Sequence, residues 1–226
     1  MRGVRETPAA PWGGAVPPPS VPPNSVTKHY DRAYFDRWYR GDDAPKGDGE
    51  LRRQVALALA AAESVLNRPV ENVLDVGAGE GRWQPVVADV RPEASWLGIE
   101  PSEYAVEHFG GTRNLMRGDL ASLATFAFEE PFDLVVCADV LHYLDDETIL
   151  RSIDELVDLV GGVAVLEVFT AADAPAGDRA GFHARPPIWY RRVFEAAGLV
   201  PIGLQMWVHE ETAGILDAMD LPVSTS

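Results

Sequence analysis

From residue 72 onward, short apolar runs alternate with segments whose apolar residues recur at helical spacing. This alternation predicts a parallel sheet covered by helices. The runs at residues 134–137 and 163–166 are apolar at every position, which is typical of central strands buried on both faces. The pattern predicts strands at residues 72–76, 95–99, 113–116, 132–138, 162–169 and 199–208, and helices at residues 82–90, 103–109, 146–160 and 188–197.

The chain before this alternation has two parts. Residues 1–25 are rich in proline and offer little apolar surface to bury, which predicts a disordered tail. Residues 26–66 hold an amphipathic helix, preceded by an aromatic stripe that consists of Tyr30, Tyr34, Phe35, Trp38 and Tyr39. We expect residues 26–66 to form a helical lid or cap on a core of residues 67–226. Within that core, residues 171–187 predict a long loop, while residues 213–221 favour a last antiparallel strand over a short helix.

Three glycines follow the first expected core strand, residues 72–76, at alternate positions. Gly77, Gly79 and Gly81 allow a sharp turn and let a nucleotide-like ligand lie against bare backbone before the next helix begins. The dinucleotide fingerprint spaces its third glycine three residues after the second, where this chain has Arg82. This spacing disfavours a pyrophosphate site.

Carboxylates close the strands that follow. Glu100 ends the second expected strand, where an acid can accept hydrogen bonds from both hydroxyls of a ribose. Asp119 closes the third and can accept a bond from an exocyclic amine such as that of adenine. The ligand crevice of an open parallel sheet lies outside the carboxyl ends of its strands, so we place these acids and the segment after the fourth strand in one candidate site.

Over residues 30–221 these motifs resemble a class I S-adenosylmethionine-dependent methyltransferase of the bacterial small-molecule type. The resemblance implies an α/β fold with a single Rossmann-like, doubly wound seven-stranded sheet. This sheet is mostly parallel with an antiparallel last strand, and helices cover both faces. The resemblance also implies S-adenosyl-L-methionine as the cofactor. The cofactor-binding residues that it implies are Tyr34, Asp75, Gly77, Ala78, Gly79, Gly81, Glu100, Pro101, Asp119, Leu120, Ala138 and His142.

Methyl transfer from a sulfonium requires in-line alignment of an acceptor and exclusion of water. Orientation alone supplies roughly 7–11 kcal/mol in well-positioned reactions, and a general base helps most when the acceptor is a hydroxyl. The candidates for catalysis are His142, His183 and Asp139. His142 has the alternative of packing beside the cofactor, and Asp139 that of capping the next turn. In the aromatic stripe, Tyr34 is the first candidate for contact with the methionine carboxylate.

The composition and net charge of the chain disfavour several classes of binding partner. A net charge of −16 disfavours nucleic acid, because phosphate binding draws its affinity from clustered Lys and Arg. No segment approaches the roughly 18 apolar residues of a membrane span. A single cysteine forms no intrachain disulfide and no Cys-rich metal site, which fits a reducing cytoplasm. We therefore expect a cytoplasmic enzyme with a small-molecule substrate and no metal, whose oligomeric state and acceptor atom (O, N or C) stay open.

Two other functions remain open at this point. One is a protein that binds S-adenosylmethionine without turnover, since the binding half of the site is better defined than the chemical half. The other is a nicotinamide-dependent oxidoreductase, which would share the glycine turn and the acidic strand end. The glycine spacing and the lack of a Tyr-x-x-x-Lys pair near the fifth strand disfavour the oxidoreductase.

Overall fold

The computed structural model describes residues 28–40, 47–173 and 178–215. The tail expected at residues 1–25 lies outside the described residues. The helices are α1 (Arg32–Arg40), α2 (Asp48–Leu66), α3 (Trp83–Val90), α4 (Glu103–Arg113), α5 (Asp146–Val157) and α6 (Pro187–Ala196), with 3-10 helices η1 (Leu120–Thr125), η2 (Leu141–Tyr143) and η3 (Ala213–Ile215). The strands are β1 (Asn72–Val76), β2 (Ser95–Glu100), β3 (Leu115–Arg117), β4 (Phe132–Ala138), β5 (Val160–Glu167), β6 (Leu199–Gly203) and β7 (Met206–His209).

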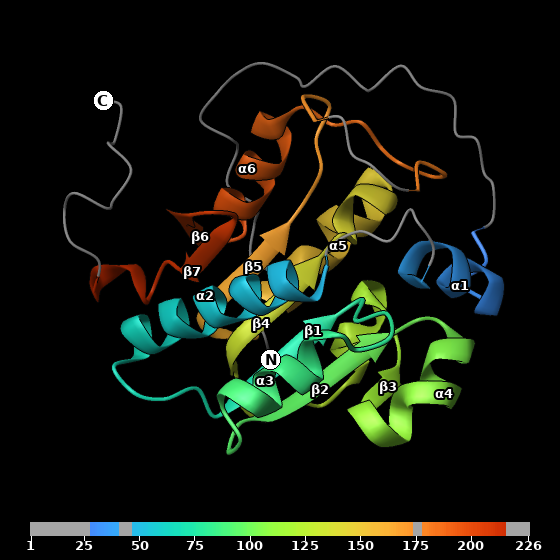
Figure 1. Ribbon diagram of the computed structural model, residues 1–226. Coiled ribbons are helices and arrows are strands. Elements are labelled where there is room, and N and C mark those ends of the chain that lie inside the picture. The colour runs from blue at the N-terminus through green and yellow to red at the C-terminus, as the bar shows by residue number, and fades with distance from the viewer. Residues whose placement is uncertain (1–27, 41–46, 174–177, 216–226) are drawn as a thin grey trace.

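The strands form one seven-stranded sheet in the order β3-β2-β1-β4-β5-β7-β6 (Figure 1). Strands β1 to β5 pair in parallel, whereas β7 pairs antiparallel with both β5 and β6. This topology confirms the expected α/β, Rossmann-like sheet with a single antiparallel strand. The order reverses between β1 and β4, and in open α/β sheets ligands bind beside such a switch point.

The antiparallel strand lies earlier in the chain than the sequence analysis places it. The single strand expected at residues 199–208 is two strands, because Leu204 and Gln205 adopt φ of 50° and 59° and reverse the chain between β6 and β7. The strand expected at residues 213–221 is wrong for its described part, which is η3. The rest of that segment lies outside the described residues.

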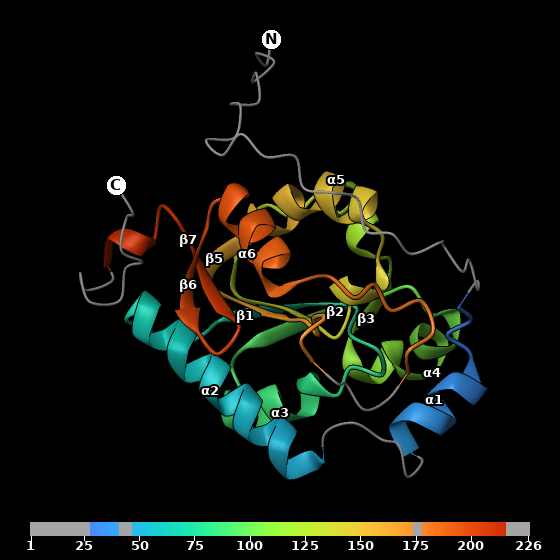
Figure 2. The same ribbon diagram turned by 90° about the horizontal axis from the view of Figure 1, so that it is seen from above.

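Both faces of the sheet are covered by helices, and Figure 2 shows α5 and α6 on one side and α2, α3 and α4 on the other. Alternate residues of β4 serve the two layers. Val135 and Cys137 pack in the core beneath α5 and α6, while Leu134 and Val136 pack in the core beneath α2 and α3. All four are fully buried, which confirms that this apolar run is a central strand.

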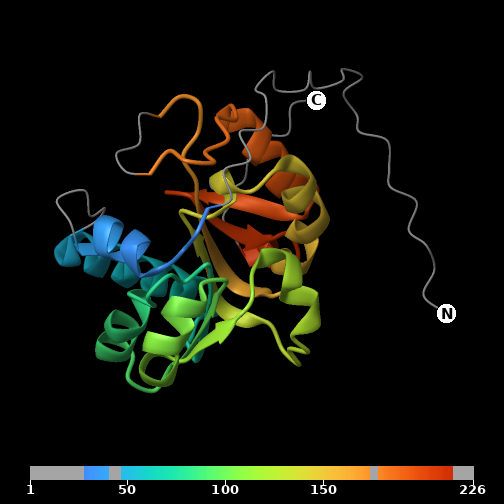
Figure 3. The same cartoon turned by 90° about the vertical axis from the view of Figure 1, so that its right-hand side faces the viewer.

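Helix α1 contains most of the aromatic stripe and lies at the same side of the molecule as the segment after β5 (Figure 3). Phe35 is its buried anchor, with its ring centre 5.6 Å from that of Tyr104 in α4. Just before the helix, the carbonyl of Tyr30 accepts a hydrogen bond from the Ser102 hydroxyl at 2.5 Å. These contacts place the chain from residue 30 to residue 40 over the carboxyl end of β2.

Candidate cofactor site at the carboxyl ends of the strands

The turn after β1 has a conformation that side chains oppose. Gly77 and Gly79 have φ of 77° and 58°, a region that L-residues other than glycine rarely adopt. A Cβ on Gly77 would collide with Val140, and one on Gly79 would collide with the hydroxyl of Tyr39. The N–H of Gly77 donates to the carbonyl of Ile99 at 2.8 Å, which ties the turn to β2. The sequence therefore needs glycine at both positions to keep this backbone bare.

Glu100 lies beside this turn at the end of β2 and is only 4% exposed. Its Oε2 accepts the backbone N–H of Gly79 at 2.7 Å, and its Oε1 accepts that of Ser102 at 2.9 Å. Burial raises the pKa of the carboxyl group, and the two N–H donors oppose that rise. Each carboxylate oxygen has a second lone pair, which leaves acceptor capacity for the two hydroxyls of a ribose.

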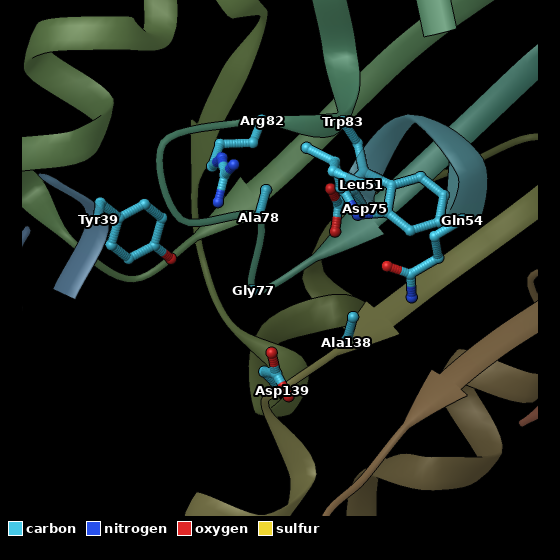
Figure 4. Close-up of a pocket in the computed structure, with 10 residues that line it drawn as sticks. All are labelled: Tyr39, Leu51, Gln54, Asp75, Gly77, Ala78, Arg82, Trp83, Ala138 and Asp139. Carbon is cyan, nitrogen blue, oxygen red and sulfur yellow. The ribbon is translucent and has the colours of Figure 1, made fainter. Parts of the chain in front are cut away.

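A pocket of about 100 Å³ opens next to the turn, between the ends of β1 and β4. Figure 4 shows the lining residues, which come from α1, α2, the end of β1, the glycine turn, the start of α3 and the end of β4. The lining residues are Tyr39, Leu51, Gln54, Asp75, Gly77, Ala78, Arg82, Trp83, Ala138 and Asp139. Five residues expected from the sequence therefore come together here: Asp75, Gly77, Ala78, Ala138 and Asp139.

Asp75 is the buried acid of this pocket, with 3% of its surface exposed. Among the described residues, no hydrogen-bond donor reaches its Oδ2. Burial, with a smaller effect from the charge of Glu100, raises the pKa of Asp75 to about 8. A buried carboxylate without a donor is costly unless it gains a proton or a cationic partner. The α-ammonium of a methionyl group supplies such a partner, so this acid fits the expected cofactor.

Arg82 gives the same pocket a positive charge, and the sequence analysis did not assign it to the site. Its guanidinium is 3.2 Å from Oδ1 of Asp48, at the start of α2. A pocket with Asp75 and Arg82 in its lining suits a zwitterion, with the ammonium toward the acid and the carboxylate toward the guanidinium. The sequence does carry a signal for this role, since Arg82 follows the third glycine directly, although the same residue also marks the departure from the dinucleotide spacing.

Tyr39, rather than Tyr34, is the tyrosine that lines the pocket, together with the aromatic side chain of Trp83. Its hydroxyl lies over Gly79, and burial raises the pKa of the phenol well above its usual value. Tyr34 instead faces Tyr30, with ring centres 5.0 Å apart. Pockets for drug-sized ligands measure about 300–1,000 Å³. The pocket is smaller than this, and the Tyr39 hydroxyl occupies the space directly over Gly79.

The two candidate histidines, His142 and His183, are not among the residues that line the pocket. His142 is 1% exposed, and its Nδ1 accepts the backbone N–H of Phe169 at 3.3 Å. Burial lowers its pKa to about 4, helped by the charges of Lys28 and Arg185. The carbonyl of His142 accepts the N–H of His183 at 2.8 Å. These bonds join the segment after β4 to the segment after β5.

The remaining expected residues lie along the same edge of the sheet, outside the pocket lining. Asp119 is exposed and caps η1, where its Oδ1 accepts the N–H of Ser122 at 2.9 Å. Leu120 is buried in the core, and Pro101 is half-buried directly after Glu100. The N–H of Gly81 donates to the carbonyl of Ala78 at 2.8 Å. The site is thus divided between a pocket beside β1 and β4 and an outer part beside β2 and β3.

The family model of a methyltransferase domain matches residues 46–211, which is more than half of the chain. The chain belongs to this family, and the expected class, an S-adenosylmethionine-dependent methyltransferase, is confirmed. Its cofactor is S-adenosyl-L-methionine. No curated protein sequence matches the chain significantly.

Solved structures of methyltransferases share this fold at low sequence identity. An amino pentose methyltransferase from Micromonospora echinaspora, solved with SAM, has a TM-score of 0.56 and 17% identity, covering 75% of this chain and 92% of that one. A SAM-dependent methyltransferase from Archaeoglobus fulgidus has a TM-score of 0.55 and 14% identity, with coverages of 74% and 73%. Magnesium protoporphyrin IX methyltransferase from Synechocystis, solved with SAH, has a TM-score of 0.54 and 21% identity, with coverages of 75% and 86%.

Three further observations concern the described ranges. No helix there is both long enough and apolar enough to cross a bilayer. His, Cys, Asp and Glu side chains in the same ranges form no group of three or more that suits a metal ion. Cys137 is a buried free thiol in β4.

Proposed function

We propose that this methyltransferase acts on a small-molecule acceptor and that the residues around the glycine turn hold its cofactor. The observation that carries the proposal is the pair of buried acids, Asp75 and Glu100, on either side of a bare backbone turn. One acid has an oxygen without a donor among the described residues, and the other is fixed to the turn itself. The net charge of −16 supports a small acceptor over a nucleic acid.

Each residue of the site would bind a different part of the cofactor. Arg82 would bind the methionine carboxylate, Asp75 the α-ammonium and Glu100 the ribose hydroxyls. Asp119 would accept a hydrogen bond from the adenine amine at the outer end of the site. When bound, the cofactor supplies a methyl group already activated by a sulfonium. These contacts would hold the methyl group in line with an acceptor beside the segment after β4 and would exclude water. Proximity and orientation would then provide most of the rate enhancement.

Asp139 is the proposed base among the three candidates, because it alone lines the pocket. Its φ of 60° is unusual for a residue other than glycine, and such strain is often found at functional sites. The backbone is held in this conformation in part by a bond from the N–H of Asp139 to the carbonyl of Glu167 at 3.1 Å. His142 would have a positioning role, since its Nδ1 accepts the N–H of Phe169 and so fastens the segment after β5 to the segment after β4. His183 contributes to the same junction only through its backbone N–H. An amine acceptor that attacks in its neutral form needs no base at all.

Calorimetry tests the binding half of the proposal. The protein should bind S-adenosylmethionine and S-adenosylhomocysteine but not NADH. Arg82→Gln should weaken both adenosyl amino acids by about 10–100-fold through loss of a charge-assisted pair, with little effect on 5′-methylthioadenosine, which lacks the amino-acid part. Arg52→Gln, which removes an exposed ion pair with Asp89, is the matched control. Equal losses for all three ligands would contradict the assigned role of Arg82.

A labelled-methyl assay against a metabolite library tests turnover. Transfer to a small molecule would support the proposal. Cofactor binding with no transfer to any acceptor would instead favour a protein that binds S-adenosylmethionine without turnover. Tight binding of NADH in the calorimetry would contradict the assignment of the glycine turn to an adenosyl amino acid.

A further inference from the structure

The ammonium group of Lys28 lies in a cage of three tyrosine rings and one carboxylate. Its Nζ is 3.4 Å from the ring centre of Tyr143 and 5.3 Å and 5.4 Å from those of Tyr34 and Tyr30. The same Nζ is 2.7 Å from Oδ2 of Asp178. Only 13% of the lysine and aspartate side chains is exposed. Aromatic faces and a carboxylate around one point form the arrangement by which proteins recognise alkylammonium groups.

The walls of this cage are also in contact with one another. The hydroxyl of Tyr143 donates to the backbone carbonyl of Asp178 at 2.7 Å. The rings of Tyr30 and Tyr34 meet edge to face. The cage therefore has contacts of its own that do not involve the lysine.

The cage adjoins the proposed cofactor site. Tyr143 belongs to η2, four residues after the pocket residue Asp139, and the charge of Asp139 is one of the causes that raise the pKa of Tyr143. On the other side, the carbonyl of Tyr30 accepts from the hydroxyl of Ser102, whose N–H donates to Glu100. The cage thus lies between the end of β2 and the segment after β4, where an acceptor has to approach the methyl group.

Holding the side chain of Lys28 in this cage costs free energy. Burial lowers the pKa of its ammonium, and the ion pair with Asp178 opposes this effect. Ordering a lysine side chain also costs rotamer entropy, and the ion pair has to offset both losses. A small molecule with an alkylammonium group presents the same charge and shape to the cage.

We propose that this cage is the acceptor subsite for small molecules that carry a primary or secondary ammonium group, and that Lys28 competes for it. The inference rests on the proposed function, because the cage recognises an acceptor only if the methyl group is delivered beside it. In this subsite the nitrogen is a recognition group. The net charge of −16 also favours an acceptor that is a cation.

The test uses n-propylammonium, which matches the part of the lysine side chain that Lys28→Ala removes. An NMR titration of the full chain should show that Lys28→Ala binds this ion at least about tenfold more tightly than the wild type. 1-Propanol, its neutral counterpart, should not bind. Adding Asp178→Asn to Lys28→Ala should abolish the gain. Arg32→Ala, which changes an exposed arginine of α1, is the control and should behave as the wild type.

Three outcomes would overturn the inference. Equal affinity of wild type and Lys28→Ala for n-propylammonium, with unchanged melting temperatures, would show that Lys28 only fastens its segment. Equal binding of 1-propanol would show an apolar cleft without charge recognition. If Lys28→Ala bound S-adenosylmethionine more tightly than the wild type does, with no change for S-adenosylhomocysteine, the cage would be assigned to the sulfonium. If the wild type bound neither S-adenosylmethionine nor S-adenosylhomocysteine, the proposed function would be refuted separately. The n-propylammonium titration does not depend on the binding of these ligands.

Discussion

The carboxylate of Glu100 accepts the backbone N–H of Gly79 at 2.7 Å and so fastens the end of β2 to the turn after β1. Two motifs that lie 21 residues apart in the sequence are thereby one structural unit. The acid is held in position before a ribose is bound, which lowers the entropy that binding has to offset. Removing the carboxylate should therefore affect both the turn and the ligand.

Substitution of Glu100 tests this unit. Glu100→Ala should weaken S-adenosylhomocysteine binding by about 1–3 kcal/mol, because the ribose and the turn lose charge-assisted hydrogen bonds. Glu100→Gln keeps one oxygen acceptor and should lose less. Calorimetry gives the dissociation constants, with Glu103→Ala on the exposed start of α4 as the control. An unchanged constant in Glu100→Ala would place the ribose elsewhere.

Gly79 should tolerate no side chain when the cofactor binds. Gly79→Val introduces strain at a φ of 58° and directs its Cβ at the Tyr39 hydroxyl, into the space above the turn. We expect binding of S-adenosylhomocysteine to be lost in calorimetry while the circular dichroism spectrum stays folded. Gly111→Val in α4, where a Cβ meets no atom within 4 Å, should bind as the wild type does. Retained affinity in Gly79→Val would mean that the turn does not contact the ligand.

Most of the fold follows from local sequence, and the hairpin at its edge does not. The strands before it are apolar runs bounded by clear turn residues, so their order along the chain was predictable. The reversal at Leu204 and Gln205 places two ordinary side chains in the left-handed region, where turn preferences give no warning. Gly203, which has a φ of 98°, is the one residue in the sequence that indicates a turn at this position.

The site was predictable where it depends on strand ends and unpredictable where it depends on helix packing. Asp75 and Ala138 follow from the rule that ligands bind at the carboxyl ends of parallel strands. The choice of Tyr39 over Tyr34 depends on the rotation of α1, which the burial of Phe35 against another helix sets. Gln54 belongs to the pocket only because α2 packs across the sheet, a long-range contact that residue spacing does not encode.

The raised pKa of Asp75 makes stability depend on pH. An unfolded aspartate titrates near 3.9, whereas the buried group titrates at about 8. Between these values the folded protein holds a proton that the unfolded chain has lost. This contribution to stability is therefore complete below about pH 4 and is lost as the pH rises to about 8, by at most about 1.4 kcal/mol per unit.

Asp75→Asn should remove this dependence. Relative to the wild type, the variant should gain stability from pH 5 to pH 8, as measured by urea unfolding at both values. Asp154→Asn, on an exposed position of α5, should leave the wild-type dependence intact. Parallel curves for wild type and Asp75→Asn would show that Asp75 is ionised in the folded protein throughout this range.

His142 should be neutral across the physiological range, which bears on its use as a base. Its pKa of about 4 results from burial, and its Nδ1 accepts the N–H of Phe169, so the ring proton belongs on Nε2. Nitrogen chemical shifts in NMR should report this tautomer, with no titration of His142 between pH 6 and 8. His142→Phe serves to assign the signal. A midpoint within that interval would show that the imidazole is available to accept a proton, and His142 would then displace Asp139 as the first candidate for the base.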